Sequence, residues 1–135
     1  MTLVDTNILL DLLTSDPVWA GWSLARLGVA EVSGALLIND IIYAELASRF
    51  DSMESLNEFV SATRLEVEPM PKAALFLAAK AFRIHKDRGG RREGVLSDFF
   101  IGAQASVLDI PILTRDTRRY RSYFPSVRLI SPNLA

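Results

Sequence analysis

Short apolar runs alternate along the chain with longer segments whose apolar residues recur at helical spacing. A run of two to four apolar residues bounded by polar ones predicts a buried strand, and apolar residues three and four apart predict a helix that covers a sheet. The predicted strands are residues 2–4, 35–38, 65–67, 111–113 and 127–130. The predicted helices are residues 7–13, 17–32, 41–46, 53–63, 71–86 and 98–108.

This alternation predicts an α/β fold in which a mostly parallel sheet carries helices on both faces. Polar residues at three predicted helix starts are expected to act as N-caps: Thr6 for the first, Asn39 or Asp40 for the third and Ser97 for the last. Neither repeats nor low-complexity linkers interrupt the pattern. We therefore expect a single domain over residues 1–135.

The composition fits a folded cytoplasmic protein. Half of the 135 residues are hydrophobic, enough for a sizeable core, which argues against a disordered chain. No secretion signal precedes the first strand, and no apolar stretch approaches the roughly 20 residues that span a bilayer. We therefore expect a soluble, cytoplasmic protein without membrane contact. The absence of cysteine excludes disulfides and cysteine zinc sites.

Charge and ligand chemistry narrow the function further. The chain has 15 basic and 16 acidic residues, so it lacks the basic excess of a simple nucleic-acid coating protein. A histidine-ligated zinc site needs more histidines than the single His85. The Gly-x-Ser-x-Gly motif that would support a Ser-His-Asp triad is absent from the sequence. The available metal ligands are carboxylates, which favour magnesium or manganese.

Four acidic residues lie where a parallel sheet gathers its ligand site. Asp5 and Asp116 follow short apolar strands, and such sites form beyond the carboxyl ends of strands. Asp98 opens a helix, whose partial positive charge stabilises a carboxylate. Glu45 falls inside a helix among apolar neighbours, where an acid is uncommon unless it is paired or metal-bound. We expect these carboxylates to meet and a divalent cation to relieve their repulsion.

Four short segments resemble the motifs of PIN-domain nucleases. They are VDTNILLD at 4–11, YAEL at 43–46, LSDFFIGA at 96–103 and LTRD at 113–116. Each motif is short, but their order and separations match the family, and together they cover nearly the whole chain. The length and layout resemble the VapC toxin branch of toxin–antitoxin systems.

The resemblance implies a three-layer α/β/α sandwich with a central, mostly parallel sheet. It implies a magnesium- or manganese-dependent endoribonuclease, in which a metal-activated water attacks the phosphorus in line and leaves a 5′-phosphate and a 3′-hydroxyl. It also implies an RNA substrate, a cognate VapB-like antitoxin protein and a homodimer. The residues carried over are the catalytic metal ligands Asp5, Glu45, Asp98 and Asp116 and the supporting residues Thr6, Asn7 and Thr114.

One position departs from the family pattern. Many relatives have a further acid three residues after the position of Asp116, where this chain has Arg119. Whether one or two metal ions bind is therefore left open.

Two basic clusters are candidates for RNA contact. Glycines in the first would allow close backbone approach to phosphates, although a solvated surface turn explains the same sequence. The second cluster surrounds the fourth acid and would lie beside the metal. The candidates are Arg88, Arg91 and Arg92 in the first cluster and Arg115 and Arg118, with Arg119 and Arg121, in the second.

Other conspicuous residues have plainer interpretations. Asp11 is expected at the surface or behind the metal ligands, and His85 near the end of its helix as a packing residue. Trp19 and Trp22 lie three apart on one helical face, which is typical of core packing. They could instead line an apolar groove that receives an antitoxin helix.

Two alternatives to a toxin stay open at this point. One is a PIN-type nuclease with a housekeeping role in RNA processing, which the residues do not separate from a toxin. The other is a catalytically silent binding module with this fold, against which the complete acidic set argues. An aspartyl-phosphate mechanism fits less well, because position 7 is Asn and no lysine follows a strand.

Overall fold

The computed structural model describes residues 1–90 and 96–132. Its sheet has five strands in the order β3-β2-β1-β4-β5, and the four pairs of neighbours run parallel. Leu3 on the central strand is in register with Leu37 on one side and Ile112 on the other. The strands are β1 (Thr2–Val4), β2 (Leu36–Ile38), β3 (Leu65–Val67), β4 (Ile112–Leu113) and β5 (Leu129–Ile130).

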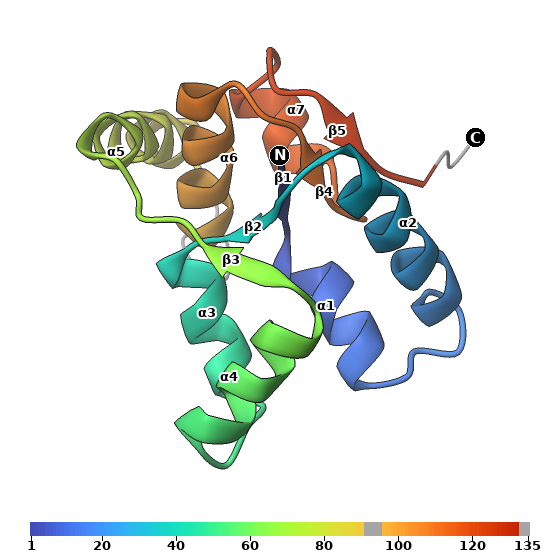
Figure 1. The fold of residues 1–135 in the computed structure, drawn as a ribbon. Helices are drawn as coiled ribbons and strands as arrows, with labels where there is room; N and C mark the ends of the chain where they lie inside the picture. Colours follow the sequence, from blue (N-terminus) through green and yellow to red (C-terminus); the bar gives the residue numbers. More distant parts are fainter. Residues whose placement is uncertain (91–95, 133–135) are drawn as a thin grey trace.

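Helices connect the strands and cover the sheet. Within the described residues they are α1 (Thr6–Leu13), α2 (Ala20–Ser33), α3 (Asp40–Ala47), α4 (Met53–Ala62), α5 (Lys72–Asp87), α6 (Leu96–Leu108) and α7 (Arg118–Tyr123). Figure 1 shows α5 and α6 on one side of the sheet and α2 on the other. The predicted α/β/α layering with a parallel sheet is confirmed.

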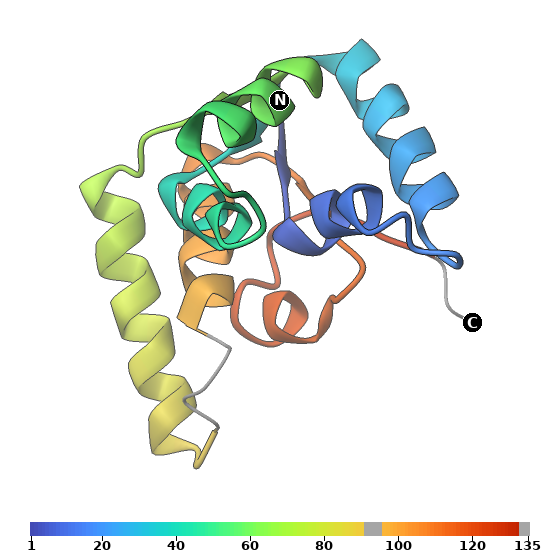
Figure 2. The same cartoon turned by 90° about the horizontal axis from the view of Figure 1, so that it is seen from below.

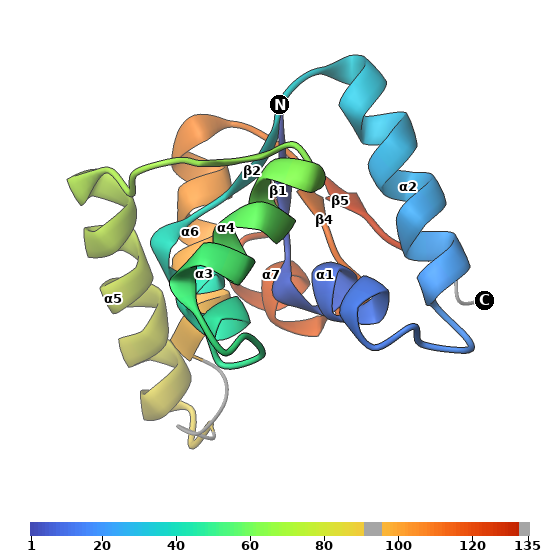
Figure 3. The same ribbon diagram turned by 60° about the horizontal axis from the view of Figure 1, so that its bottom comes forward.

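The order of the strands explains why the helices occupy both faces. From β1 the chain moves outward to β2 and β3, and it then returns across the sheet to β4 on the other side of β1. Right-handed crossovers in opposite directions place their helices on opposite faces. The α3–α4 pair makes the crossover from β2 to β3, and α5 and α6 make the return (Figure 3).

The core explains why the central strands β1 and β4 are mostly apolar. Leu3, Val4, Ile112 and Leu113 have no exposed surface, because helices cover both faces of the sheet. Helix α6 is the most buried helix, with Phe99, Ile101 and its neighbours to Ala105 inside. This burial fixes the position of its first turn, where Asp98 lies.

A buried polar bridge ties three elements together. Asn39 caps α3 by accepting a hydrogen bond from the backbone of Ile42, and its Nδ2 donates to Gln104 Oε1 on α6 at 2.9 Å. The Gln104 amide in turn donates to the carbonyls of Glu68 and Pro69, just after β3. Because these amides are paired, they can be buried at little cost, and they fix α3 against α6.

Several predicted boundaries needed correction. Thr6 is not the cap of the first helix: Asp5 is, and it accepts from the Thr6 backbone N–H at 2.7 Å. Ser97 lies inside α6, which is already helical at Leu96. Helix α2 begins at Ala20 rather than at Pro17.

One helix was not predicted. Helix α7 is only six residues long, Arg118–Tyr123, and its sequence RRYRSY shows little apolar periodicity. None of the helices in the described part of the chain is both long enough and apolar enough to cross a bilayer.

Candidate active site

The predicted acids come from four segments around the carboxyl end of β1. Asp5 follows β1, Asp116 follows β4, Asp98 lies in the first turn of α6 and Glu45 lies on α3. Strands β1 and β4 are neighbours from which the chain departs in opposite directions, so this is the topological switch point of the sheet, where ligands of α/β folds bind. Figure 2 shows α1, α3, α6 and α7 gathered around this end.

Asp5 is held by a dense set of donors. It is only 6% exposed. Its Oδ1 accepts from the Thr6 backbone, while its Oδ2 accepts from the hydroxyls of Tyr120 at 2.7 Å and Thr114 at 2.9 Å. The Asn7 amide approaches the same Oδ2 at 3.4 Å. The direction of this carboxylate is therefore fixed by β1, α1, β4 and α7 together.

The electrostatics of Asp5 reflect its burial. Loss of hydration raises the pKa of Asp5 above 3.8, and the hydrogen bonds from Tyr120, Thr114 and Thr6 offset part of this increase. The charge of Glu45 adds to the increase. Within residues 1–90 and 96–132, no positively charged side chain is among the groups that shift the pKa of Asp5.

Asp98 has the most perturbed titration in the site. Burial raises its pKa to about 7, and repulsion by Asp5, Asp116 and Glu45 adds to the effect. Arg119 acts in the opposite direction but does not cancel it. The charges of the other three predicted acids therefore all act on Asp98, as expected for groups gathered at one end of the sheet.

The apolar neighbours of Glu45 in the sequence suggested an interior acid, and this prediction is wrong. Its side chain is exposed, and its Oε1 accepts from the Thr6 hydroxyl at 2.7 Å. The apolar residues Ile42 and Leu46 turn into the core, while Glu45, beside them on α3, is exposed. A contact across 39 residues of chain thus joins α3 to the start of α1.

Asp116 is also exposed. Its Oδ1 lies 3.4 Å from the guanidinium of Arg118, and the two side chains are 54% and 84% exposed. The backbone N–H of Asp116 donates to the Thr114 hydroxyl, which holds the turn after β4. The fourth acid is therefore fixed at its backbone, while its carboxylate faces solvent.

The three supporting residues all contact acids or one another. Thr6 binds Glu45, and Thr114 binds Asp5. Asn7 donates to the Thr114 hydroxyl at 3.1 Å and accepts from the backbone of Arg115 at 3.1 Å, so it joins the start of α1 to the end of β4. These contacts fit the orienting role that their motif positions suggested.

Tyr120 is the residue of this site that the sequence did not indicate. It is 1% exposed, and its hydroxyl donates to Asp5 from 115 positions away. Burial, followed by the charges of Asp5 and Asp98, raises the Tyr120 pKa well above 10, so the phenol remains a donor. The only signal was a tyrosine four residues after the fourth acid.

Of the arginines predicted to contact RNA, Arg115 is instead engaged within the fold. Arg115 forms a bidentate pair with Asp11 at 2.7 and 2.8 Å and lies over the ring of Trp19. Asp11, expected at the surface or behind the ligands, is buried at 3% exposure and also accepts from the Ser23 hydroxyl. Arg115 is thus engaged in the fold.

The remaining arginines are more open. Arg118 is exposed beside Asp116, and Arg88 lies over the ring of Tyr123. Arg119 lies near Asp98, and its buried Nε has no hydrogen-bond partner among the described residues. The candidates Arg91 and Arg92 lie outside the described residues.

The donor set is suited to a hard divalent cation. All four groups are carboxylates, and burial and the charges of the other three acids raise the pKa of Asp98, an effect that a bound cation would oppose. In residues 1–90 and 96–132 no three acidic or histidine side chains already stand in a ligating arrangement. Glu45 and Asp116 are the exposed acids of this set, whereas Asp5 is buried.

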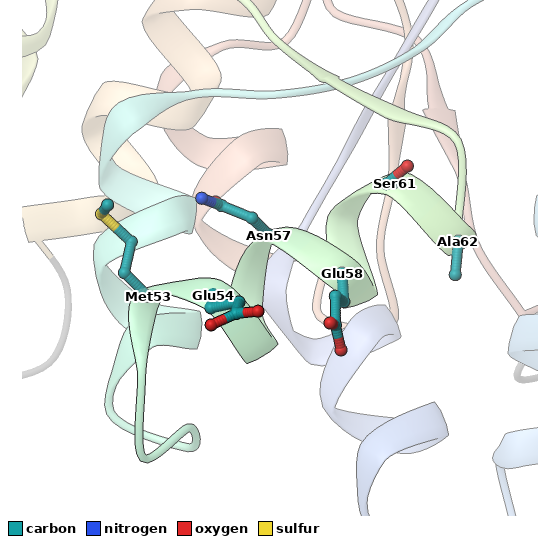
Figure 4. A pocket seen from close by; sticks show the side chains of 6 residues that line it. All are labelled: Met53, Glu54, Asn57, Glu58, Ser61 and Ala62. Atoms are coloured by element: carbon teal, nitrogen blue, oxygen red, sulfur yellow. The ribbon is translucent and has the colours of Figure 1, made fainter.

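A separate surface hollow is not part of this site. It follows one exposed side of α4 and is lined by Met53, Glu54, Asn57, Glu58, Ser61 and Ala62 (Figure 4). None of these side chains contributes to the hydrogen bonds around Asp5.

The PIN domain family model matches residues 2–125 of the chain. The chain belongs to the PIN-domain family. Comparison with curated protein sequences gives no match.

Solved structures share this PIN fold over nearly their whole length. A chain of VapBC2 from Rickettsia felis bound to a promoter DNA fragment is 17% identical, with a TM-score of 0.74 and 98% of each chain covered. FitAcB from Neisseria gonorrhoeae is 21% identical, with a TM-score of 0.67 and full coverage of both chains. A toxin–antitoxin complex from Klebsiella pneumoniae is 18% identical, with a TM-score of 0.60 and coverage of 94% and 95%.

Proposed function

We propose that this PIN-domain protein is a magnesium- or manganese-dependent endoribonuclease and the toxin of a toxin–antitoxin pair. The observation that carries the proposal is that the charges of Asp5, Asp116 and Glu45 all act on Asp98 beside the end of the central strand. A divalent cation beside Asp5 and Asp98 would favour their ionised forms, which burial and the neighbouring acids disfavour.

The residues have distinct roles in the proposed reaction. Asp5 would hold the cation from a buried position and Asp98 from a half-buried one, and the exposed Glu45 and Asp116 would complete the set. When bound, the cation supplies the charge that lowers the pKa of a water and polarises the phosphodiester. Thr6 keeps Glu45 near the site, and Thr114 and Asn7 keep Asp5 in place.

Arg119 bears on the number of cations. It places a positive charge beside Asp98 at the position where many relatives have an acid. A permanent charge there reduces the need for a second ion, so a single cation is the simpler proposal. Arg118 and Arg88, which are exposed, are the candidates for contact with RNA phosphates.

The proposed partners follow from the relatives. The solved structures include a toxin–antitoxin complex and VapBC and FitAcB assemblies. We therefore propose a VapB-like antitoxin as the partner, a homodimer as the assembly and the cytoplasm as the location. The half-buried Trp19 and Trp22, whose rings meet edge to face, remain candidates for part of the antitoxin surface.

RNA cleavage by the purified protein tests the proposal. Cleavage is expected with magnesium or manganese, and it should disappear with a chelator and in Asp98→Asn. Asp109→Asn is the matched control, because Asp109 lies before β4 at the opposite end of the sheet and its positive φ of 54° suits asparagine. Equal cleavage by Asp98→Asn and the wild type would contradict the acidic-site mechanism.

Growth assays separate a toxin from a housekeeping nuclease. Expression of the chain alone should inhibit growth, and co-expression of a cognate antitoxin should restore it. Asp5→Asn should remove the inhibition. A cleaving enzyme that does not inhibit growth would favour the housekeeping role.

A further inference from the structure

The hydrogen bonds of Asp5 are distributed unequally between its two oxygens. Oδ2 accepts from Tyr120 at 2.7 Å and Thr114 at 2.9 Å, with the Asn7 amide at 3.4 Å. Among the residues that the structure describes, Oδ1 accepts only from the Thr6 backbone. A carboxylate oxygen has about two lone-pair sites, so Oδ2 is filled and Oδ1 keeps one site free.

We propose that Tyr120 is a positioning residue of the active site, whose hydroxyl occupies Asp5 Oδ2 so that Oδ1 alone remains to bind the cation. The inference rests on the proposed function. It goes beyond it because it assigns a role to a residue outside the four motifs and a binding mode, through one oxygen, to Asp5.

Burial makes Tyr120 suited to this role. The ring is 1% exposed, so the hydroxyl cannot swing away to solvent, and the contact joins α7 to the end of β1. Thr114 approaches the same oxygen from β4. Two donors from different elements fix both the position and the rotation of the carboxylate, which a single donor would not do.

The neutrality of the donors is as important as their position. Tyr120, Thr114, Asn7 and the Thr6 backbone carry no formal charge, so Asp5 keeps its full negative charge for a cation. Arg115, the nearest arginine in sequence to Thr114, is instead paired with Asp11. An arginine bound to Asp5 would neutralise the ligand and weaken the attraction for the metal.

Manganese affinity of the variant Tyr120→Phe tests the proposal. The substitution keeps the buried ring and removes only the hydroxyl. Loss of such an orienting partner typically costs about 10–100-fold in metal affinity. We expect a loss of about tenfold, measured by calorimetric titration of the purified, RNA-free protein with Mn²⁺.

Tyr123→Phe is the matched control. It removes a phenol hydroxyl from the same helix, but this hydroxyl contacts His85 Nδ1 at 3.0 Å rather than an acid of the site. Its manganese affinity should equal that of the wild type. Equal affinity of the wild type and Tyr120→Phe, both folded by circular dichroism, would overturn the inference while leaving the proposed function intact. Absence of specific Mn²⁺ binding by the wild type would overturn both.

If Tyr120→Phe does not fold, infrared spectroscopy of the wild type tests whether Asp5 binds the cation through one oxygen. A carboxylate bound through one oxygen has a wider separation of its two infrared stretching bands than one bound through both. The magnesium-induced difference spectrum, with Asp5→Asn as the reference, should contain the wide separation. A narrow separation assigned to Asp5 would overturn the inference.

Discussion

The titration of Asp98 makes the free energy of unfolding depend on pH. Its pKa is about 7 in the folded chain against 3.8 ordinarily, so between these values the folded state holds a proton that the unfolded state loses. The contribution of Asp98 to the free energy of unfolding therefore falls as pH rises between these two values. Above pH 7 the ionised carboxylate destabilises the fold to its full extent.

Asp98→Asn should remove this penalty in the absence of metal. We expect the variant to be more stable than the wild type by about 1–3 kcal/mol at pH 8, a range discounted from the roughly 1.4 kcal/mol per pKa unit because Asp98 is partly exposed. Near pH 4 the difference should vanish. Urea unfolding in a chelator at both pH values measures it, and a difference independent of pH would contradict an origin in the titration of Asp98.

The pair of Arg115 and Asp11 predicts that Arg115 stabilises the fold. Arg115→Met would leave a carboxylate of 3% exposure without its bidentate partner. Breaking a buried pair costs about 3–5 kcal/mol, and since the Arg115 side chain is a quarter exposed we expect about 2–3. Arg118→Met, at a pair of exposed side chains, should leave the unfolding free energy unchanged. Equal midpoints in urea for both variants would refute this assignment.

The residues whose place follows from the local sequence could be predicted. Asp5 and Asp116 follow apolar strands, so their place at the strand ends could be derived before any contact was known. Contacts between residues far apart in the sequence could not be predicted. The Tyr120 contact with Asp5 spans 115 positions and the Arg115 contact with Asp11 spans 104, and neither partner carries a local sign of the other.

At the scale of elements, strands and long helices could be predicted from the apolar pattern, whereas α7 could not. Strand β1 and strand β3 have the predicted bounds, because each short apolar or half-apolar run is flanked by polar residues. Helix α7 has six residues, too few to be stable alone, and it depends on the burial of Tyr120 and on its packing against α6. Tertiary packing of that kind leaves no periodic signal.

The contact between α6 and the end of α7 gives a prediction for that pair of elements. A Cβ on Gly102 of α6 would overlap the ring of Phe124, which is 4% exposed just after α7. Gly102→Ala should therefore lower the unfolding free energy by about 1–3 kcal/mol, although alanine favours helix. Gly28→Ala on α2, with nothing within 4 Å of the new Cβ, should raise it by about 0.5–1 kcal/mol. Thermal unfolding compares the two, and the same sign for both would contradict the packing argument.

At the scale of the whole molecule, the four acids belong to four different segments of the fold. Asp5 follows β1, Glu45 lies on α3, Asp98 on α6, and Asp116 precedes α7. A cation bound by all four adds a link between these segments. By mass action, an ion at 100 times its dissociation constant raises the unfolding free energy by about 2.7 kcal/mol.

This link predicts where the molecule becomes more rigid. Saturating magnesium at pH 8 should slow amide exchange at the start of α1, along α3 and in the first turns of α6, because local opening of these segments would first have to break the metal site. Amides of α2 and of the middle of α5, which carry none of the four acids, should exchange at unchanged rates. Asp98→Asn should show neither the added stability nor the local protection. Uniform slowing over all helices would contradict binding at the end of β1 and would indicate a general effect of the salt on the fold.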